Sequence, residues 1–158
     1  MNGMGNGKFA PDNRLTRGQL VTTLYRLAGE PEETASVSFQ DVPENCYFTK
    51  AVAWAAQNGI ARGVSDTAFA PNATVTREQA ATFLYRYVTL FLQHEPATGG
   101  DLSQFSDASR ISPFAKEAMA WATAVNLLEG YGNGTVGPKD PVNRAQMAKF
   151  LTLLDQNF

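Results

Sequence analysis

Three stretches of the chain share one pattern of polar and apolar positions, at residues 15–26, 75–86 and 142–153. In each stretch apolar residues recur at intervals of three and four, which predicts a helix with one apolar face. A single apolar stripe cannot bury itself, so we expect the three helices to face one another in one core. The stripes are Leu20, Leu24 and Leu27; Ala80, Phe83, Leu84 and Tyr87; and Met147, Phe150, Leu151 and Leu154.

A polar residue marks the predicted start of each helix, and a glutamine follows it three positions later. This is the capping-box pattern, in which the cap oxygen and the glutamine side chain satisfy exposed N–H groups reciprocally. The pairs are Thr16 with Gln19, Thr76 with Gln79, and Asn143 with Gln146.

Each predicted helix opens with an arginine, namely Arg17, Arg77 and Arg144. A helix N-terminus carries partial positive charge, so a cation there costs about 0.3–1 kcal/mol. Two interpretations are open. The unpaired N–H groups of the first turn and the guanidinium together form a site for a carboxylate or phosphate. Alternatively, each arginine pairs with a nearby Asp or Glu and ties the repeats together.

Copies two and three carry a further element that copy one lacks. Segments of similar sequence around Trp54 and Trp121 predict helices at roughly 47–58 and 113–126, and each leads to a glycine, Gly63 or Gly130. A full repeat is therefore a helix, a glycine-containing loop, a turn and a capped helix. The chain holds two full repeats and the second half of one, so we expect the first repeat to be truncated before Met1.

Composition narrows the class of protein. The 158 residues are 44% hydrophobic and 18% charged, which is ordinary for a globular domain. A formal charge of −2 without a basic run argues against nucleic acid as a partner. Cys46 is the lone cysteine, so no intrachain disulfide or cysteine-based metal site is expected, and no apolar run approaches the length of a membrane span.

The repeat resembles a known family, the S-layer homology (SLH) repeat. The resemblance rests on an ordered pattern that runs through most of the chain and occurs three times in register. In copy two its positions are Phe39, Asp41, Tyr47, Phe48, Ala51, Val52, Trp54, Ala55, Gly59, Ile60, Gly63, Phe69, Pro71, Thr76, Arg77 and Gln79.

The resemblance implies an all-α fold: a pseudo-trimeric assembly with a central three-helix bundle of the capped helices and helix-loop prongs around it. The expected units are 1–29 (second half of repeat 1), 36–92 (repeat 2) and 102–158 (repeat 3), together one domain. We also expect the truncated repeat to expose apolar surface near Phe9 and Leu15, which favours self-association.

By the same resemblance, the domain is a non-catalytic anchor at the bacterial cell surface, in the cell wall or S-layer. The partner that the resemblance implies is secondary cell wall polysaccharide, an acidic (pyruvylated) glycan, bound in grooves between repeats. No cofactor or metal is implied. The implied glycan-binding residues are Arg17, Arg77, Arg144, Thr16, Thr76, Gln79, Gly63 and Gly130.

Other interpretations of single residues compete with this one. Trp54 and Trp121 could stack on sugars, although their setting among alanines favours the core. Asp41 and Asp107 recur with the repeat, which favours turn capping or pairing with an arginine over a catalytic pair. His94 is the lone histidine. Because no acid–base or nucleophile constellation is visible, an enzyme is disfavoured, and the alternative to a glycan anchor is an assembly module of a surface layer.

Overall fold

The structure, a computed structural model, describes residues 13–32 and 39–158, and within them the regular structure is helical. The α-helices are α1 (Arg17–Leu27), α2 (Thr49–Gln57), α3 (Arg77–Arg86), α4 (Lys116–Ala124) and α5 (Arg144–Asn157). A π-helical turn, η1 (Tyr87–Phe91), prolongs α3, and the short 3-10 turns are η2 (Leu102–Gln104), η3 (Ala108–Arg110) and η4 (Pro113–Ala115). The predicted all-α fold is confirmed.

The three predicted capping boxes are present. Thr16, Thr76 and Asn143 each accept a hydrogen bond from the backbone N–H three residues later, and the glutamine at that position returns a bond to the cap. Asparagine in the third copy therefore caps α5 in the same way as threonine caps α1 and α3. All three helices begin at the predicted arginine.

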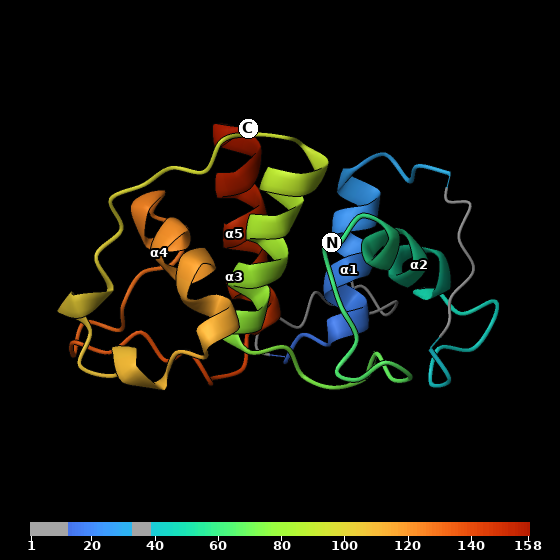
Figure 1. Ribbon diagram of the computed structural model, residues 1–158, viewed down its shortest axis with the longest axis horizontal. Helices are drawn as coiled ribbons and strands as arrows, with labels where there is room; N and C mark the ends of the chain where they lie inside the picture. Colours follow the sequence, from blue (N-terminus) through green and yellow to red (C-terminus); the bar gives the residue numbers. More distant parts are fainter. Residues whose placement is uncertain (1–12, 33–38) are drawn as a thin grey trace.

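The residues just ahead of these caps join in a closed ring of backbone hydrogen bonds. The N–H of Leu15 donates to the carbonyl of Val142, that of Val142 to Val75, and that of Val75 back to Leu15, at 2.8, 3.0 and 2.9 Å. All three side chains are buried. The ring fixes the starts of α1, α3 and α5 at one end of the molecule, where Figure 1 shows the three helices upright and side by side.

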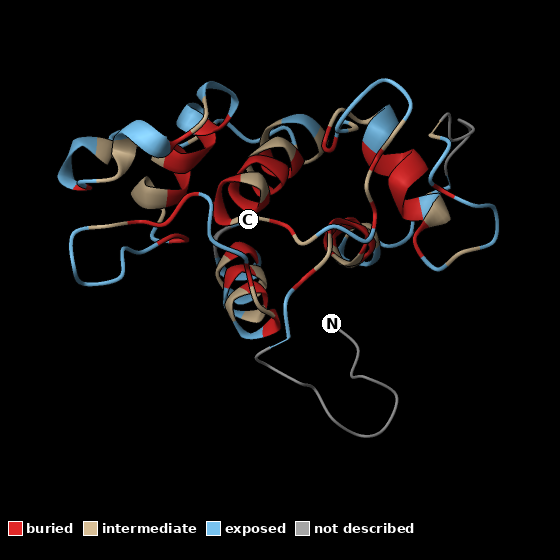
Figure 2. Ribbon diagram, turned by 90° about the horizontal axis from the view of Figure 1, so that it is seen from below, coloured by how far each residue is buried: buried red, intermediate tan, exposed pale blue. Residues whose placement is uncertain are grey.

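The remaining two helices flank this central group, α2 beside α1 and α4 beside α3 (Figure 1). Each contact crosses a repeat boundary, because α2 and α4 open the repeats that follow α1 and α3. The buried side chains form one hydrophobic cluster, so the prediction of a single core is confirmed. Figure 2 shows buried residues along the helices and exposed residues mainly in the outer loops.

Trp54 and Trp121 belong to this core, each 2% exposed, which confirms the packing interpretation. Trp54 of α2 lies against Tyr25 of α1 and against Tyr87 and Phe91 of the π-helical turn, with ring centroids 5.6, 6.3 and 5.2 Å away. The π-helical turn thus carries two aromatic rings onto α2 of its own repeat.

The helix pairs α1–α2 and α3–α4 differ in which partner contributes the larger residue at one equivalent pair of positions. Where α1 has Gly18, an added Cβ would lie 3.3 Å from the ring of Phe48. The equivalent residues in the next pair are Glu78 on α3 and Ala115 ahead of α4, both buried. The first pair thus has the smaller residue on the capped helix and the second pair has the larger one there, an exchange that a closely packed interior tolerates.

Some expectations need correction. The helices predicted at 47–58 and 113–126 are shorter, and Pro113 begins a 3-10 turn ahead of α4 because proline suits the first turn. Leu15 was expected near exposed apolar surface, but it is 1% exposed because the backbone ring draws it into the core. Phe9 lies outside the described residues.

We predict that Leu84→Ala lowers the free energy of unfolding by about 2–5 kcal/mol, because Leu84 is fully buried and its truncation leaves a cavity. Chemical denaturation measures the change. Leu90→Ala is the matched control, since Leu90 is 53% exposed and its loss should cost far less. Equal effects of the two substitutions would show that the stripe on α3 is not the core.

Candidate functional site

Two of the arginines that open the helices, Arg17 and Arg77, donate to carbonyls in the loops of the following repeat. Arg17 donates from Nε to the carbonyl of Phe69 at 2.9 Å and from a terminal nitrogen to that of Arg62 at 2.8 Å. Its guanidinium also lies over the rings of Phe69 and Phe83, 4.7 and 5.2 Å from their centroids. Arg17 is 4% exposed, so this cation is held inside the interface between repeats.

Arg77 repeats this arrangement one repeat later. It donates to the carbonyls of Val136 and Glu129 at 2.9 and 2.8 Å. Val136 stands where the previous interface has Phe69 and offers no aromatic face, and Tyr131 supplies one instead, 4.7 Å from the guanidinium. Burial lowers the pKa of Arg77, and the neighbouring Tyr131 and Asp140 act in the opposite direction. Arg144 is buried as well.

The first-turn N–H groups of these helices have backbone partners. Arg17 and Gly18 donate their N–H groups to the carbonyls of Ala73 and Pro71. The corresponding groups of Arg77 and Glu78 donate to Asp140 and Pro138, and that of Arg144 donates to Asn13. The hypothesis that unpaired N–H groups form an anion site is therefore wrong for these amides. Of the two interpretations, the geometry agrees with the tie between repeats, although the arginines bond carbonyls in place of acids.

The other predicted site residues also have structural partners. Thr16, Thr76 and Gln79 form the capping boxes. An added Cβ at Gly130 would lie 2.8 Å from the ring of Phe105, and one at Gly63 would lie 2.5 Å from the ring of Phe39. These glycines therefore leave room for Phe39 and Phe105, which lie two residues before Asp41 and Asp107. Whether any of these residues also contacts a glycan stays a prediction.

Asp41 and Asp107 each clamp a turn of their own repeat. The carboxylate of Asp41 accepts the N–H groups of Phe69 and Ala70 at 2.9 and 2.7 Å. Asp107 accepts those of Val136 and Gly137, both at 2.9 Å. The predicted turn capping is confirmed. Because the clamped turns carry the carbonyls that the arginines bond, each aspartate supports an arginine tie.

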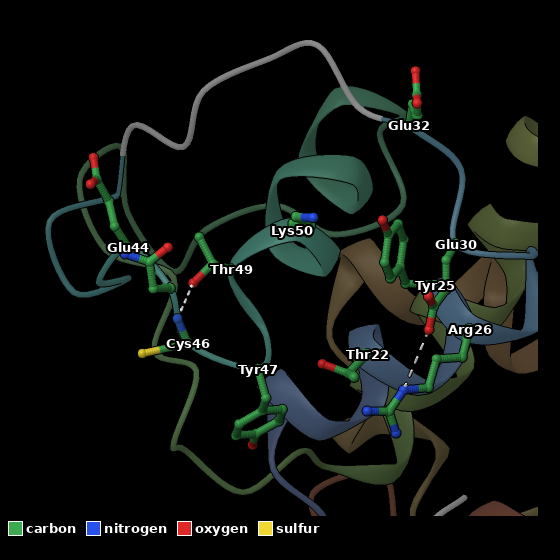
Figure 3. A pocket seen from close by; sticks show the side chains of 11 residues that line it. Thr22, Tyr25, Arg26, Glu30, Glu32, Glu44, Cys46, Tyr47, Thr49 and Lys50 are labelled. Carbon is green, nitrogen blue, oxygen red and sulfur yellow. Dashed lines mark hydrogen bonds and ion pairs between the residues drawn. The ribbon is translucent and has the colours of Figure 1, made fainter.

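A cavity of about 790 Å³ opens between α1 and the segment that leads into α2. Figure 3 shows side chains of α1 on one side and those of residues 44–50 on the other. The lining residues include Tyr25, Arg26, Glu30, Glu44, Tyr47 and Lys50. It holds none of the predicted site residues, which lie nearer the helix starts and loops.

The sequence offered one signal for this cavity. The signal is the pair of neighbouring aromatic residues Tyr47 and Phe48. Phe48 is 5% exposed and packs in the core, whereas Tyr47 is 58% exposed. An exposed aromatic ring beside polar groups suits a sugar, which presents both apolar faces and hydroxyls. Tyr25, Arg26 and Lys50 carried no separate signal, because their positions on two different helices come together only in the fold.

The second interface is built differently. A smaller cavity of about 190 Å³ lies between α4 and the linker at 96–100. At its edge the hydroxyl of Tyr85 donates to Glu117 at 2.8 Å. Burial and that carboxylate raise the pKa of Tyr85 to about 12. Tyr85 and Glu117 correspond to Tyr25 and Lys50 of the first interface, so one charge is reversed.

A buried acid also distinguishes the second interface. The carboxylate of Glu78 accepts the N–H and the hydroxyl of Ser112, both at 2.8 Å, and forms an ion pair with Lys139. These contacts satisfy a carboxylate that is 3% exposed. The first interface has Gly18 at this position and no such cluster among its described residues.

Two searches of the described residues (13–32 and 39–158) bear on the class of site. They contain no cluster of three or more His, Cys, Asp or Glu side chains suited to a metal ion. None of their helices has the length and apolar character needed to cross a membrane.

The fold and interfaces define a helical repeat domain in which each unit is completed by its neighbour. The chain belongs to the S-layer homology domain family, which matches residues 1–21, 38–81 and 104–148. This match confirms the resemblance seen in the sequence and places the domain at the bacterial cell surface.

Relatives agree with this assignment. The chain is 36% identical to the surface-layer 125 kDa protein of Lysinibacillus sphaericus over 92% of its own length, 32% identical to an endoglucanase of Bacillus sp. (strain KSM-635) over 92%, and 24% identical to the cellulosome-anchoring protein of Acetivibrio thermocellus over 92%. It spans 12%, 15% and 33% of those proteins, respectively.

We predict that acid weakens this fold through Asp41 and Asp107. Burial acts to raise the pKa of Asp41, but the N–H groups of Phe69 and Ala70 and the charge of Arg17 outweigh it, so the pKa lies below its ordinary value. Asp107 is shifted in the same direction. A depressed folded-state pKa stabilises the fold above the unfolded value of about 3.9, and this contribution is lost as the pH falls through the folded value.

Melting temperatures measured from pH 7 down to pH 2 test this. Asp41→Asn should lower the melting temperature at pH 7, because an amide offers one acceptor oxygen where the carboxylate offers two. It should also flatten the fall in stability at acid pH. Asp66→Asn is the control, since Asp66 is exposed and no clamp of this kind involves it. An unchanged acid profile in Asp41→Asn would rule out the clamp as its source.

Proposed function

We propose that this domain is a non-catalytic anchor that binds a polysaccharide of the bacterial cell wall through the cavity between its first two repeats. Membership of the S-layer homology family supports the proposal, and the cavity between α1 and residues 44–50 is the site that we propose for the polysaccharide. An exposed tyrosine ring and several charged side chains offer stacking and hydrogen bonding to sugar rings.

The range of relatives supports anchoring over catalysis. An endoglucanase and an amylopullulanase share this stretch with a surface-layer protein and a cellulosome-anchoring protein. The shared stretch is 15% of the endoglucanase and 8% of the amylopullulanase. A segment common to proteins with such different names supports a shared role in attachment, separate from their chemistry.

We propose further that the bound polymer is acidic, as the resemblance implied. The cavity itself carries Glu30, Glu32 and Glu44 beside Arg26 and Lys50, so its net charge does not attract a carboxylate. A neutral sugar of the polymer suits the cavity, and the acidic substituent would meet arginines elsewhere. Contacts of Arg17, Arg77 and Arg144 with that substituent belong to this proposal, although only a small edge of each is accessible.

Sedimentation with purified cell walls tests the anchor. The domain should sediment with walls that retain their polysaccharide and stay in solution with walls stripped of it. Sedimentation with both preparations would indicate another wall component, and sedimentation with neither would contradict the proposal. Binding only to surface-layer protein would favour the assembly module.

We predict that Tyr47→Ala weakens wall binding by about tenfold, which corresponds to about 1.4 kcal/mol, through loss of the exposed ring. Phe114→Ala is the matched control, because Phe114 is the equivalent residue of the next repeat, is 54% exposed, and does not line the cavity. Titration calorimetry with solubilised polysaccharide measures both. Equal losses in the two variants would place the binding outside this cavity.

We also predict that Arg77→Ala weakens binding of acidic polysaccharide by about tenfold or more, and more than Arg144→Ala does. A charge-assisted contact contributes about 1.5–3 kcal/mol, and copy two retains the complete motif. Arg77→Lys should lose affinity too, since an ammonium lacks the planar fork.

Titrating polysaccharide with and without its acidic groups distinguishes two roles of these arginines: direct contact with the polymer, and a structural bond between repeats. A direct contact predicts a loss confined to the acidic polymer. A tie alone predicts equal losses for both polymers and a lower melting temperature. A greater effect of Arg144→Ala would reverse the ranking.

A further inference from the structure

Two arginines on neighbouring elements, Arg62 and Arg86, stand apart from the other cations at the repeat interfaces. Arg62 precedes the loop glycine Gly63 and is exposed. The equivalent residue of the next repeat is Glu129, which precedes Gly130 and forms an ion pair with Lys149 at 3.4 Å. The same loop position is thus acidic and paired in one interface but basic in the other.

Arg86 also differs from its equivalent residue, Arg26, in lacking an ion pair among the described residues. It follows Tyr85 near the end of α3, as Arg26 follows Tyr25 on α1. Arg26 lies 3.9 Å from Glu30. Within the described residues, neither Arg62 nor Arg86 takes part in a salt bridge with a carboxylate. The equivalent residues Glu129 and Arg26 each have a partner of opposite charge, whereas Arg62 and Arg86 have none among the described residues.

The packing brings Arg62 and Arg86 to one seam of the molecule. The carbonyl of Arg62 accepts from Arg17, whose guanidinium lies 5.2 Å from the ring centroid of Phe83 on α3. Phe83 and Arg86 are three residues apart on a helix and so share a face. Further along the seam, an added Cβ at Gly59 would lie 3.3 Å from Leu90. The loop after α2 therefore runs along the end of α3 that carries Arg86.

The positive charges of Arg62 and Arg86 repel each other. Burial lowers the pKa of Arg86, and the positive charge of Arg62 lowers it further. Arg86 is half-buried. The chain continues past it through the π-helical turn, so free carbonyls at a helix end do not offset its charge. Two like charges without a counter-charge destabilise the fold slightly, and such local conflicts are expected at functional sites.

We propose that Arg62 and Arg86 form an anion site, separate from the cavity and from the arginines that open the helices, that receives a carboxylate or phosphate group of an acidic wall polysaccharide. This inference rests on the proposed function and deepens it, because it gives the acidic group a place that the cavity lacks. Two guanidinium forks offer several N–H donors in geometries that match an oxyanion, and the bound group removes their repulsion.

A charge reversal gives the sharpest test. Arg62→Glu places an acid where the next repeat has Glu129, so it should pair with Arg86, raise the melting temperature, and abolish the anion site. Arg86→Gln should weaken binding of the acidic polysaccharide by about tenfold without lowering the melting temperature. Lys149→Gln is the control, since it removes a paired cation and should leave binding unchanged.

The probe is solubilised wall polysaccharide, titrated by calorimetry before and after carbodiimide amidation. Amidation neutralises carboxylates and leaves phosphodiesters charged. If amidation removes the difference between wild type and Arg86→Gln, the group is a carboxylate; if the difference persists, it is a phosphate. Either result supports the site.

Other outcomes overturn this inference. If wild type, Arg62→Glu and Arg86→Gln bind the polysaccharide equally, the arginine pair is a tolerated surface repulsion and the anion site does not exist. If Arg86→Gln loses binding only in proportion to a lower melting temperature, the role of Arg86 is structural. Failure of the proposed function is distinct from both, because the wild-type domain would then bind no wall polysaccharide at all.

Discussion

The ring of backbone hydrogen bonds among Leu15, Val75 and Val142 is the constraint on which the rest of the structure depends. Each bond contributes only about 1 kcal/mol net, but the ring joins three segments that are far apart in the chain. It sets the starts of α1, α3 and α5 at a common level. Two residues after each ring position an arginine opens the helix, so the ring also directs the arginines into the interfaces.

The repeats complete one another, and none is a unit by itself. α1 packs with α2 and α3 with α4, while Arg17 and Arg77 reach carbonyls of the following repeat. A substitution in one repeat is therefore felt in the next, as expected where stability comes from interfaces between neighbours. The interfaces also differ in residue size, since the first has Gly18 near Phe48 and the second has Glu78 and Ala115 at the equivalent positions.

The charged side chains at the repeat interfaces fall into a buried group and an exposed group. The guanidinium groups of Arg17 and Arg77 are buried and donate to backbone carbonyls, and a buried charge costs stability unless its contacts are made. Charges open to solvent lie elsewhere, in the cavity between α1 and residues 44–50 and at Arg62 with Arg86. In the function proposed above, the cavity would bind neutral sugar and the Arg62–Arg86 pair would bind an acidic group.

The sequence by itself determined the helices, their caps, the arginine at each start and the all-α fold, because these depend on residues within a few positions of one another. It also favoured turn capping or pairing with an arginine for Asp41 and Asp107 through their place in the repeat, and the structure shows the turn capping. Only the tertiary structure decided where the arginines bond. Their acceptors are backbone carbonyls, which every residue carries, so no side-chain pattern points to them. The cavity beside Tyr47 and the pairing of Arg62 with Arg86 likewise depend on how separate helices pack.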